Sequence, residues 1–143
     1  MRAKEYLRQI NTMQKRIDSL RDEVDKLRDS ISHPKPINYD KDPVQGGSQS
    51  DGMTNTIAKY VDLEREIEQK VDELIMFRHK VVGEINQLKE ANHIELLRLR
   101  YVDGYTFEQI ACTMTYSFRQ VLRIHGSALQ EFDRVILHNI KMS

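Results

Sequence analysis

Apolar residues recur in steps of three and four through the first 32 residues. The recurring positions are Ala3, Tyr6, Ile10, Met13, Ile17, Leu20, Val24, Leu27 and Ile31. This repeat places apolar side chains along one stripe of an α-helix and is typical of a coiled-coil seam. With Ile10 at heptad position a, β-branched residues occupy a, while Met or Leu occupies d, an arrangement that favours two strands in parallel pairs. The partner is either a second copy of the chain or its own second helix, and the pattern leaves both open.

A second apolar stripe predicts a long amphipathic helix over 53–91. Its members are Ile57, Tyr60, Ile67, Val71, Leu74, Val81, Ile85 and Leu88. Glu64 and Arg78 interrupt this stripe, and polar residues in a seam fix its register and partner at a cost in stability. At 1.5 Å per residue the first helix would span about 48 Å and the second about 57 Å, lengths that suit an antiparallel hairpin.

The segment between these two helices, 33–52, is predicted to be a flexible linker. It holds all three prolines and three of the six glycines of the chain. Proline removes an amide donor and glycine adds backbone entropy, so both disfavour a continuous helix. A loop of about 20 residues is longer than a compact domain usually contains, which indicates a mobile connection or a functional segment.

The pattern changes in residues 92–143 to short helical units separated by turn signals. Asp103-Gly104 is a turn dipeptide, so a first short helix should end just before it. Thr106-Phe107-Glu108-Gln109 and Ser117-Phe118-Arg119-Gln120 have the spacing of a capping box, which marks the start of two further helices. The apolar positions that this unit should bury are Ile110, Met114, Tyr116, Val121, Ile124 and Leu129. We therefore predict a C-terminal helix-turn-helix and an all-α fold for the chain as a whole.

Composition excludes several classes of protein. Cys112 is the only cysteine and the five histidines are scattered, so we expect neither an intrachain disulfide nor a metal site. No nucleophile lies beside a paired base and no glycine-rich phosphate loop is present, so we expect no enzyme and no cofactor. No apolar run has the length of a membrane helix, and the first residues lack a secretion signal, so a cytoplasmic protein is expected. Cys112 itself is expected to be a small buried or half-buried residue.

The stretch LLRLRYVDGYTFEQIACTMTYSFRQVLRIHGSALQEF resembles region 4 of bacterial sigma factors, a helix-turn-helix that reads promoter DNA. The likeness lies in a T-x-x-x-I-A helix followed by a second motif, with matching residues at Ser117, Val121, Ile124, Ala128 and Leu129. From Val44 onward the chain is also similar to small bacteriophage proteins of Gram-positive bacteria, akin to the ArpU and RinA-type late transcription regulators. This resemblance implies a sequence-specific DNA-binding regulator of phage genes, with activation of late genes in the host cytoplasm as its expected task.

The resemblance also implies which residues touch double-stranded DNA. If the helix that starts at Ser117 enters the major groove, its first turns face the bases. The expected base contacts are Phe118, Arg119, Leu122 and Arg123. The expected phosphate contacts are Arg98, Arg100, Thr106, Ser117 and Ser127. Arg119 and Arg123 also have a structural interpretation as solvated charges, and Ser117 has one as a helix cap.

Net charge argues against tight DNA binding by one copy. Residues 93–143 hold 6 basic and 5 acidic side chains, so a monomer would neutralise few phosphates. A homodimer through the coiled-coil helices would double the contacts. Two alternatives stay open: a DNA-packaging recognition subunit resembling a small terminase, and an adaptor that docks on RNA polymerase through Phe118 and Leu122. His125 would reach a phosphate or cover the helix flank, and we favour the flank.

Overall fold

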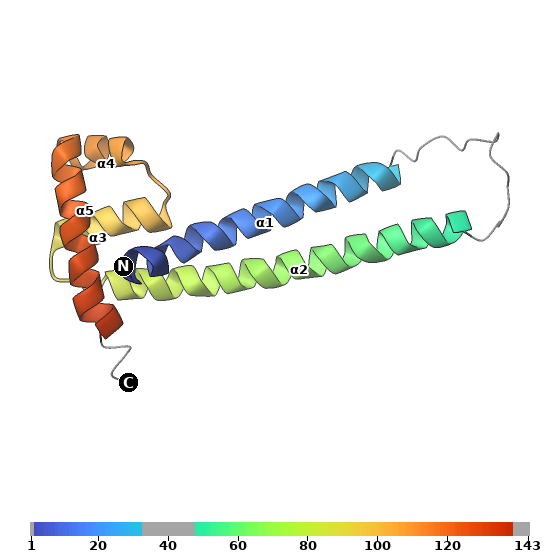
Figure 1. Ribbon diagram of the computed structural model, residues 1–143, viewed down its shortest axis with the longest axis horizontal. Helices are drawn as coiled ribbons and strands as arrows, with labels where there is room; N and C mark the ends of the chain where they lie inside the picture. Colours follow the sequence, from blue (N-terminus) through green and yellow to red (C-terminus); the bar gives the residue numbers. More distant parts are fainter. Residues whose placement is uncertain (1, 33–47, 139–143) are drawn as a thin grey trace. The chain divides into compact units, whose positions relative to one another are not determined.

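The computed structural model describes residues 2–32 and 48–138, and every regular element in these ranges is helical. This confirms the predicted all-α fold. The elements in chain order are α1 (Arg2–Ser32), α2 (Ser48–Ile85), α3 (Ala91–Leu97), η1 (Arg98–Val102), α4 (Phe107–Met114), α5 (Phe118–Phe132) and η2 (Asp133–Leu137) (Figure 1). The elements η1 and η2 are π-helical turns that continue α3 and α5.

The chain forms two compact units, which we describe separately. Unit 1 consists of Met1–Gln14 and Glu73–Ser143, and unit 2 consists of Lys15–Asp72. Both long helices contribute one part to each unit. The short helices belong to unit 1 alone.

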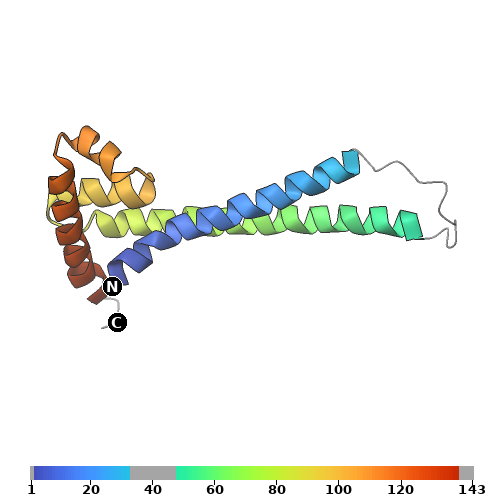
Figure 2. The same ribbon diagram turned by 45° about the horizontal axis from the view of Figure 1, so that its top comes forward.

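Unit 2 is an antiparallel pair formed by the second half of α1 and the first part of α2 (Figure 2). Its core joins Leu20 and Val24 of α1 to Leu63 and Ile67 of α2. The burial of these side chains confirms the seam predicted for α1 and gives it a partner helix within the same chain. Leu63 completes the stripe on α2, although the predicted stripe did not include it.

Charged side chains line the edges of this seam. A guanidinium nitrogen of Arg16 lies 3.7 Å from a carboxylate oxygen of Glu66, and one of Arg28 lies 3.9 Å from a carboxylate oxygen of Glu64. Arg28 also donates a hydrogen bond to the hydroxyl of Tyr60, at 3.4 Å. Exposed ion pairs of this kind add little stability, but they oppose a shift in register between the two helices. Glu64, which interrupts the apolar stripe, therefore belongs to the pairing of α1 with α2.

The bounds of α2 differ from the predicted helix 53–91 at both ends. The helix begins at Ser48, so part of the predicted linker is helical, while residues 33–47 lie outside the described ranges. Gly52 is accommodated inside the helix, where one glycine costs about 1 kcal/mol. At the other end the helix stops at Ile85, although Leu88 is still buried. The apolar period thus continues past the last helical turn because Leu88 fills the core from the connecting segment.

Unit 1 packs the first turns of α1 and the last turns of α2 together with the short helices. Side chains that are completely or almost completely buried include Leu7, Val81, Ile85, Leu96, Leu97, Ile110, Val121 and Phe132. Tyr6 joins three helices, since its ring lies 5.6 Å from that of Phe77 and 5.9 Å from that of Phe132. Its hydroxyl donates a hydrogen bond to Glu84, at 2.6 Å. The beginning of α1 is therefore fixed to both α2 and α5.

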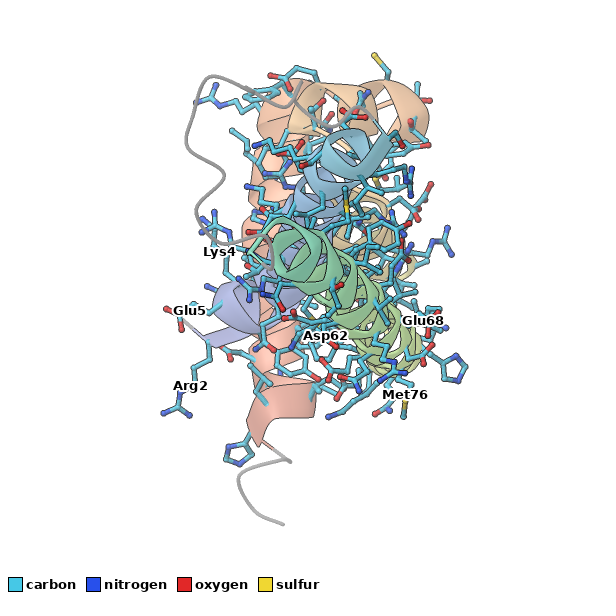
Figure 3. The ribbon with its side chains drawn as sticks, turned by 90° about the vertical axis from the view of Figure 1, so that its right-hand side faces the viewer. Arg2, Lys4, Glu5, Asp62, Glu68 and Met76 are labelled. Carbon is cyan, nitrogen blue, oxygen red and sulfur yellow. The ribbon has the colours of Figure 1, made fainter. Side chains whose placement is uncertain are left out.

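The outward-facing positions of unit 1 are mostly polar. Arg2 and Glu5 extend from the first turns of α1 away from the helices (Figure 3). Met76 of α2 also points outward and is 73% exposed (Figure 3). Its neighbour Ile75 is 60% exposed as well. The polar and apolar faces of the first turns of α1 thus follow the amphipathic pattern of the sequence.

Candidate nucleic-acid interface

The two helices of the candidate interface, α4 and α5, both begin with the predicted capping boxes. The hydroxyl of Thr106 accepts from the amide of Gln109 at 3.1 Å, and the Gln109 side chain accepts from the amide of Thr106 at 2.9 Å. Ser117 and Gln120 repeat this arrangement at 3.1 and 2.9 Å. Reciprocal caps satisfy amides that a helix start leaves without partners. The starts of both helices are therefore set by residues in their own first turns.

A left-handed residue joins the two helices. Thr115 has φ 60° and ψ 43°, and the amides of Thr115 and Tyr116 both donate to the carbonyl of Ala111. The left-handed conformation of Thr115 ends α4 at Met114. Only a short link remains before α5 begins at Phe118. The two helices and the short link of the predicted helix-turn-helix are thus present between Phe107 and Phe132.

Most of the apolar positions predicted for this unit are buried or half-buried, but Tyr116 and Cys112 are exposed. The expectation for both residues was wrong. Tyr116 is 37% exposed and lies in the link, directly after the left-handed residue Thr115. Cys112 follows the fully buried Ile110 by two residues, a rotation of about 200° around the helix, so it faces solvent.

The four predicted base-contacting residues lie on one exposed face of α5. Phe118 is 46% exposed and Leu122 is 42% exposed, and Arg119 and Arg123 are exposed as well. Residues at positions i, i+1, i+4 and i+5 share one side of a helix. Among the described residues, neither arginine forms an ion pair or a hydrogen bond with a side chain. Both guanidinium groups are therefore available to an external partner.

The predicted phosphate contacts fall into two groups. Arg98, Thr106, Ser117 and Ser127 are exposed. Arg100 is half-buried, donates a hydrogen bond to the carbonyl of Tyr105 at 3.0 Å, and lies 4.1 Å above the ring of Phe107. These contacts give Arg100 an intramolecular role that the sequence did not indicate.

His125 is a core residue, which corrects the expectation that it covers the helix flank or reaches a phosphate. It is 9% exposed and its Nε2 lies 2.6 Å from the hydroxyl oxygen of Tyr101. The Phe107 ring meets the imidazole edge-on at 4.9 Å. Burial lowers the pKa of His125 to about 4, and the positive charges of Arg100, Lys4 and Arg8 act in the same direction. The imidazole is therefore neutral at pH 7. The burial of His125 could have been predicted from its helical spacing from Val121 and Ala128, which are both buried.

A second polar contact ties α3 to α5. His93 Nδ1 lies 3.2 Å from the carboxylate of Glu131, and both side chains are largely buried. Glu131 lies on the buried side of α5, near the buried residues Leu129 and Phe132. No local pattern in the sequence relates His93 to Glu131, because the two residues lie on different helices. This contact helps to fix the orientation of α5 in unit 1.

Other kinds of site are not found in the described residues. There, no group of three or more His, Cys, Asp or Glu side chains is placed to hold a metal ion. No helix over residues 2–32 or 48–138 is both long enough and apolar enough to cross a membrane.

These features define an all-α protein in which two long paired helices precede a capped helix-turn-helix. The family model DUF1492, described as a protein of unknown function, matches residues 30–133, and the chain belongs to this family. The match runs from the last turn of α1 to the end of α5, so it includes the candidate interface. No curated protein and no solved structure matches the chain.

Proposed function

We propose that the protein is a sequence-specific DNA-binding transcription regulator that reads double-stranded DNA with the first turns of α5. The observation that carries this proposal is the exposed face of α5, where Arg119 and Arg123 have no partner side chain among the described residues. Guanidinium groups can bond guanine O6 and N7 as a fork. The capped start of α5 at Ser117 supports an approach of DNA to this end of the helix, because the first amides of a helix carry partial positive charge and attract phosphate.

The resemblance to sigma factor region 4 narrows the target to promoter DNA. On this proposal the protein regulates phage genes in the cytoplasm of a bacterial host, as an activator of late genes. Arg98, Thr106, Ser117 and Ser127 would contact the DNA backbone. Arg100 is omitted from this set because it is half-buried, whereas the other four residues are exposed. The small net charge of residues 93–143 favours a dimer that contacts two half-sites.

The apolar residues on the same face have a place in this proposal. Phe118 and Leu122 would touch thymine methyl groups, which are the apolar feature of the major groove. Their exposure also favours a second candidate function, an adaptor that docks on RNA polymerase. Together with Tyr116 they form three exposed apolar residues near the start of α5. Protein partners bury such residues at the centre of an interface.

Selection of bound sequences from a random duplex library, followed by titration with the selected duplex, tests the proposal. Arg119→Ala and Arg123→Ala should each weaken specific binding about 5- to 150-fold, since one forked contact contributes about 1–3 kcal/mol of discrimination. Arg134→Ala is the matched control, because this exposed arginine lies on η2, eleven residues and about three helical turns beyond Arg123. Thermal unfolding should be unchanged in all three variants.

Two results would reject DNA reading by α5. The first is the failure of the library to yield any preferred sequence. The second is an equal loss of binding in the Arg134→Ala control. Retention of RNA polymerase by the wild-type protein but not by Phe118→Ser, without any preferred DNA sequence, would instead support the adaptor.

A further inference from the structure

Unit 1 contains a cavity that is separate from the exposed face of α5. Its volume is about 650 Å³, within the range of about 300–1,000 Å³ typical of small-molecule sites. The walls come from the first half of α1, from α2 and from the segment 100–105. These three segments are distant in the sequence, so the cavity exists only in the folded unit.

The charge of the cavity wall is positive. Arg8, Arg78 and Arg100 contribute three guanidinium groups, one from each wall segment, and Asp103 contributes the only carboxylate of the lining, which gives a net charge of +2. Within the described residues none of the three arginines forms an ion pair with a carboxylate. Positive groups that outnumber the carboxylates of a concave site favour the binding of an anion.

Two of these guanidinium groups are held in place by the backbone of the wall. Arg78 donates to the carbonyl of Val102 at 3.3 Å, and Arg100 donates to the carbonyl of Tyr105 at 3.0 Å. The two carbonyls flank a tight turn in which Gly104 has φ +76°, a conformation that favours glycine. A guanidinium carries five N–H donors, so each arginine keeps most of its donors for a ligand. Orientation before binding lowers the entropic cost of binding.

We propose that this cavity binds a small phosphate-bearing anion of about the size of a mononucleotide, with Arg8, Arg78 and Arg100 around the phosphate. A phosphate group carries up to two negative charges, which balances the net charge of the wall. It also offers several oxygens, which suits three guanidinium groups better than the two oxygens of a carboxylate do. Ile10 and Tyr105 also line the cavity and would contact the less polar part of the ligand. The proposal does not depend on DNA binding by α5.

Isothermal titration calorimetry of the full chain with adenosine monophosphate, inorganic pyrophosphate and citrate tests this site. Both phosphate compounds should bind saturably with one site per chain, and citrate should bind at least about tenfold more weakly. Arg8→Gln and Arg78→Gln should each lower the affinity about tenfold or more, since hydrogen bonds to charged groups contribute about 1.5–3 kcal/mol. Arg2→Gln is the matched control, because Arg2 lies on the same helix but outside the cavity. A preference for the nucleotide over pyrophosphate identifies an organic phosphate as the ligand class, and the reverse identifies an inorganic one.

Several outcomes would overturn the proposal. These are the absence of saturable binding by either phosphate compound, equal affinity for citrate, or an Arg8→Gln variant that binds like the wild type. Duplex DNA that displaces adenosine monophosphate, with DNA binding lost in Arg8→Gln, would assign the arginines to the DNA backbone and also overturn it. The variants should unfold at the wild-type temperature, because Arg8 and Arg78 are exposed. If Arg78→Gln is nevertheless less stable, Arg8→Gln alone decides, since the hydrogen bond of Arg8 to Thr12 uses its backbone carbonyl, and its guanidinium has no hydrogen bond among the described residues.

Discussion

Acid should destabilise unit 1 through His125. In the folded chain the pKa of His125 is about 4, whereas the ordinary value for histidine is 6.5. Above pH 6.5 the imidazole is neutral in both the folded and the unfolded chain, so it gives no pH dependence. As the pH falls below 6.5, the unfolded chain takes up a proton that the folded chain excludes. The free energy of unfolding should therefore fall until the pH reaches about 4.

The size of this effect follows from the two pKa values. Between pH 7 and pH 5 the selective protonation of the unfolded chain lowers the free energy of unfolding by about 2 kcal/mol. That is a large share of the 5–15 kcal/mol typical of a small domain. The buried position of His125 between Tyr101 and Phe107 keeps solvent from screening the effect.

Urea unfolding at a series of pH values measures the effect, with His125→Gln as the comparison. The variant keeps every carboxylate and every other histidine, so the difference between the two curves isolates His125. The wild type should lose about 2 kcal/mol more than the variant between pH 7 and pH 5. Identical pH dependence in the two proteins would refute this reasoning. An NMR titration of the wild-type imidazole provides an independent check, and a midpoint near 6.5 would also refute it.

Two further predictions concern the stability of the helices. Ser117→Ala should lower the free energy of unfolding by about 1 kcal/mol through loss of the cap of α5, whereas Ser127→Ala, an exposed serine within the same helix, should change it by less than about 0.5 kcal/mol. Equal effects of the two serine substitutions in thermal unfolding would contradict this assignment of the cap. Leu20→Ala should cost about 2–5 kcal/mol because Leu20 belongs to the core of unit 2, while Val61→Ala, at an exposed site of the same unit, should be nearly neutral. A Leu20→Ala protein with wild-type urea unfolding would mean that α1 and α2 do not pair as described.

The parts of the fold that depend on local signals were predictable from the sequence. The two capping boxes set the first residues of α4 and α5, and each box lies within four consecutive residues. The seam of α1 was equally visible, because its apolar residues recur at helical spacing along one continuous helix. The exposed face of α5 followed from the same spacing, read from the opposite side of the helix.

The parts that depend on tertiary contacts were not predictable in this way. The periodicity of apolar residues predicted an end of α2 beyond Ile85, because it includes Leu88. Leu88 is buried, but it lies in the connecting segment after the helix. His125 was predicted to lie at the surface because its side chain is polar, although Val121 and Ala128, which share its side of α5, are buried. The arginines of the cavity could not be grouped at all, since Arg8, Arg78 and Arg100 come together only when three distant segments pack.

The exposure of Cys112 has a practical consequence for experiments on this protein. It is the only thiol of the chain and lies on the solvent side of α4. A maleimide fluorophore would therefore attach at a single known position of the native chain, with no cysteine to introduce or remove. Because α4 and α5 pack together in unit 1, the anisotropy of that dye would report on the motion of the helix-turn-helix when a ligand arrives.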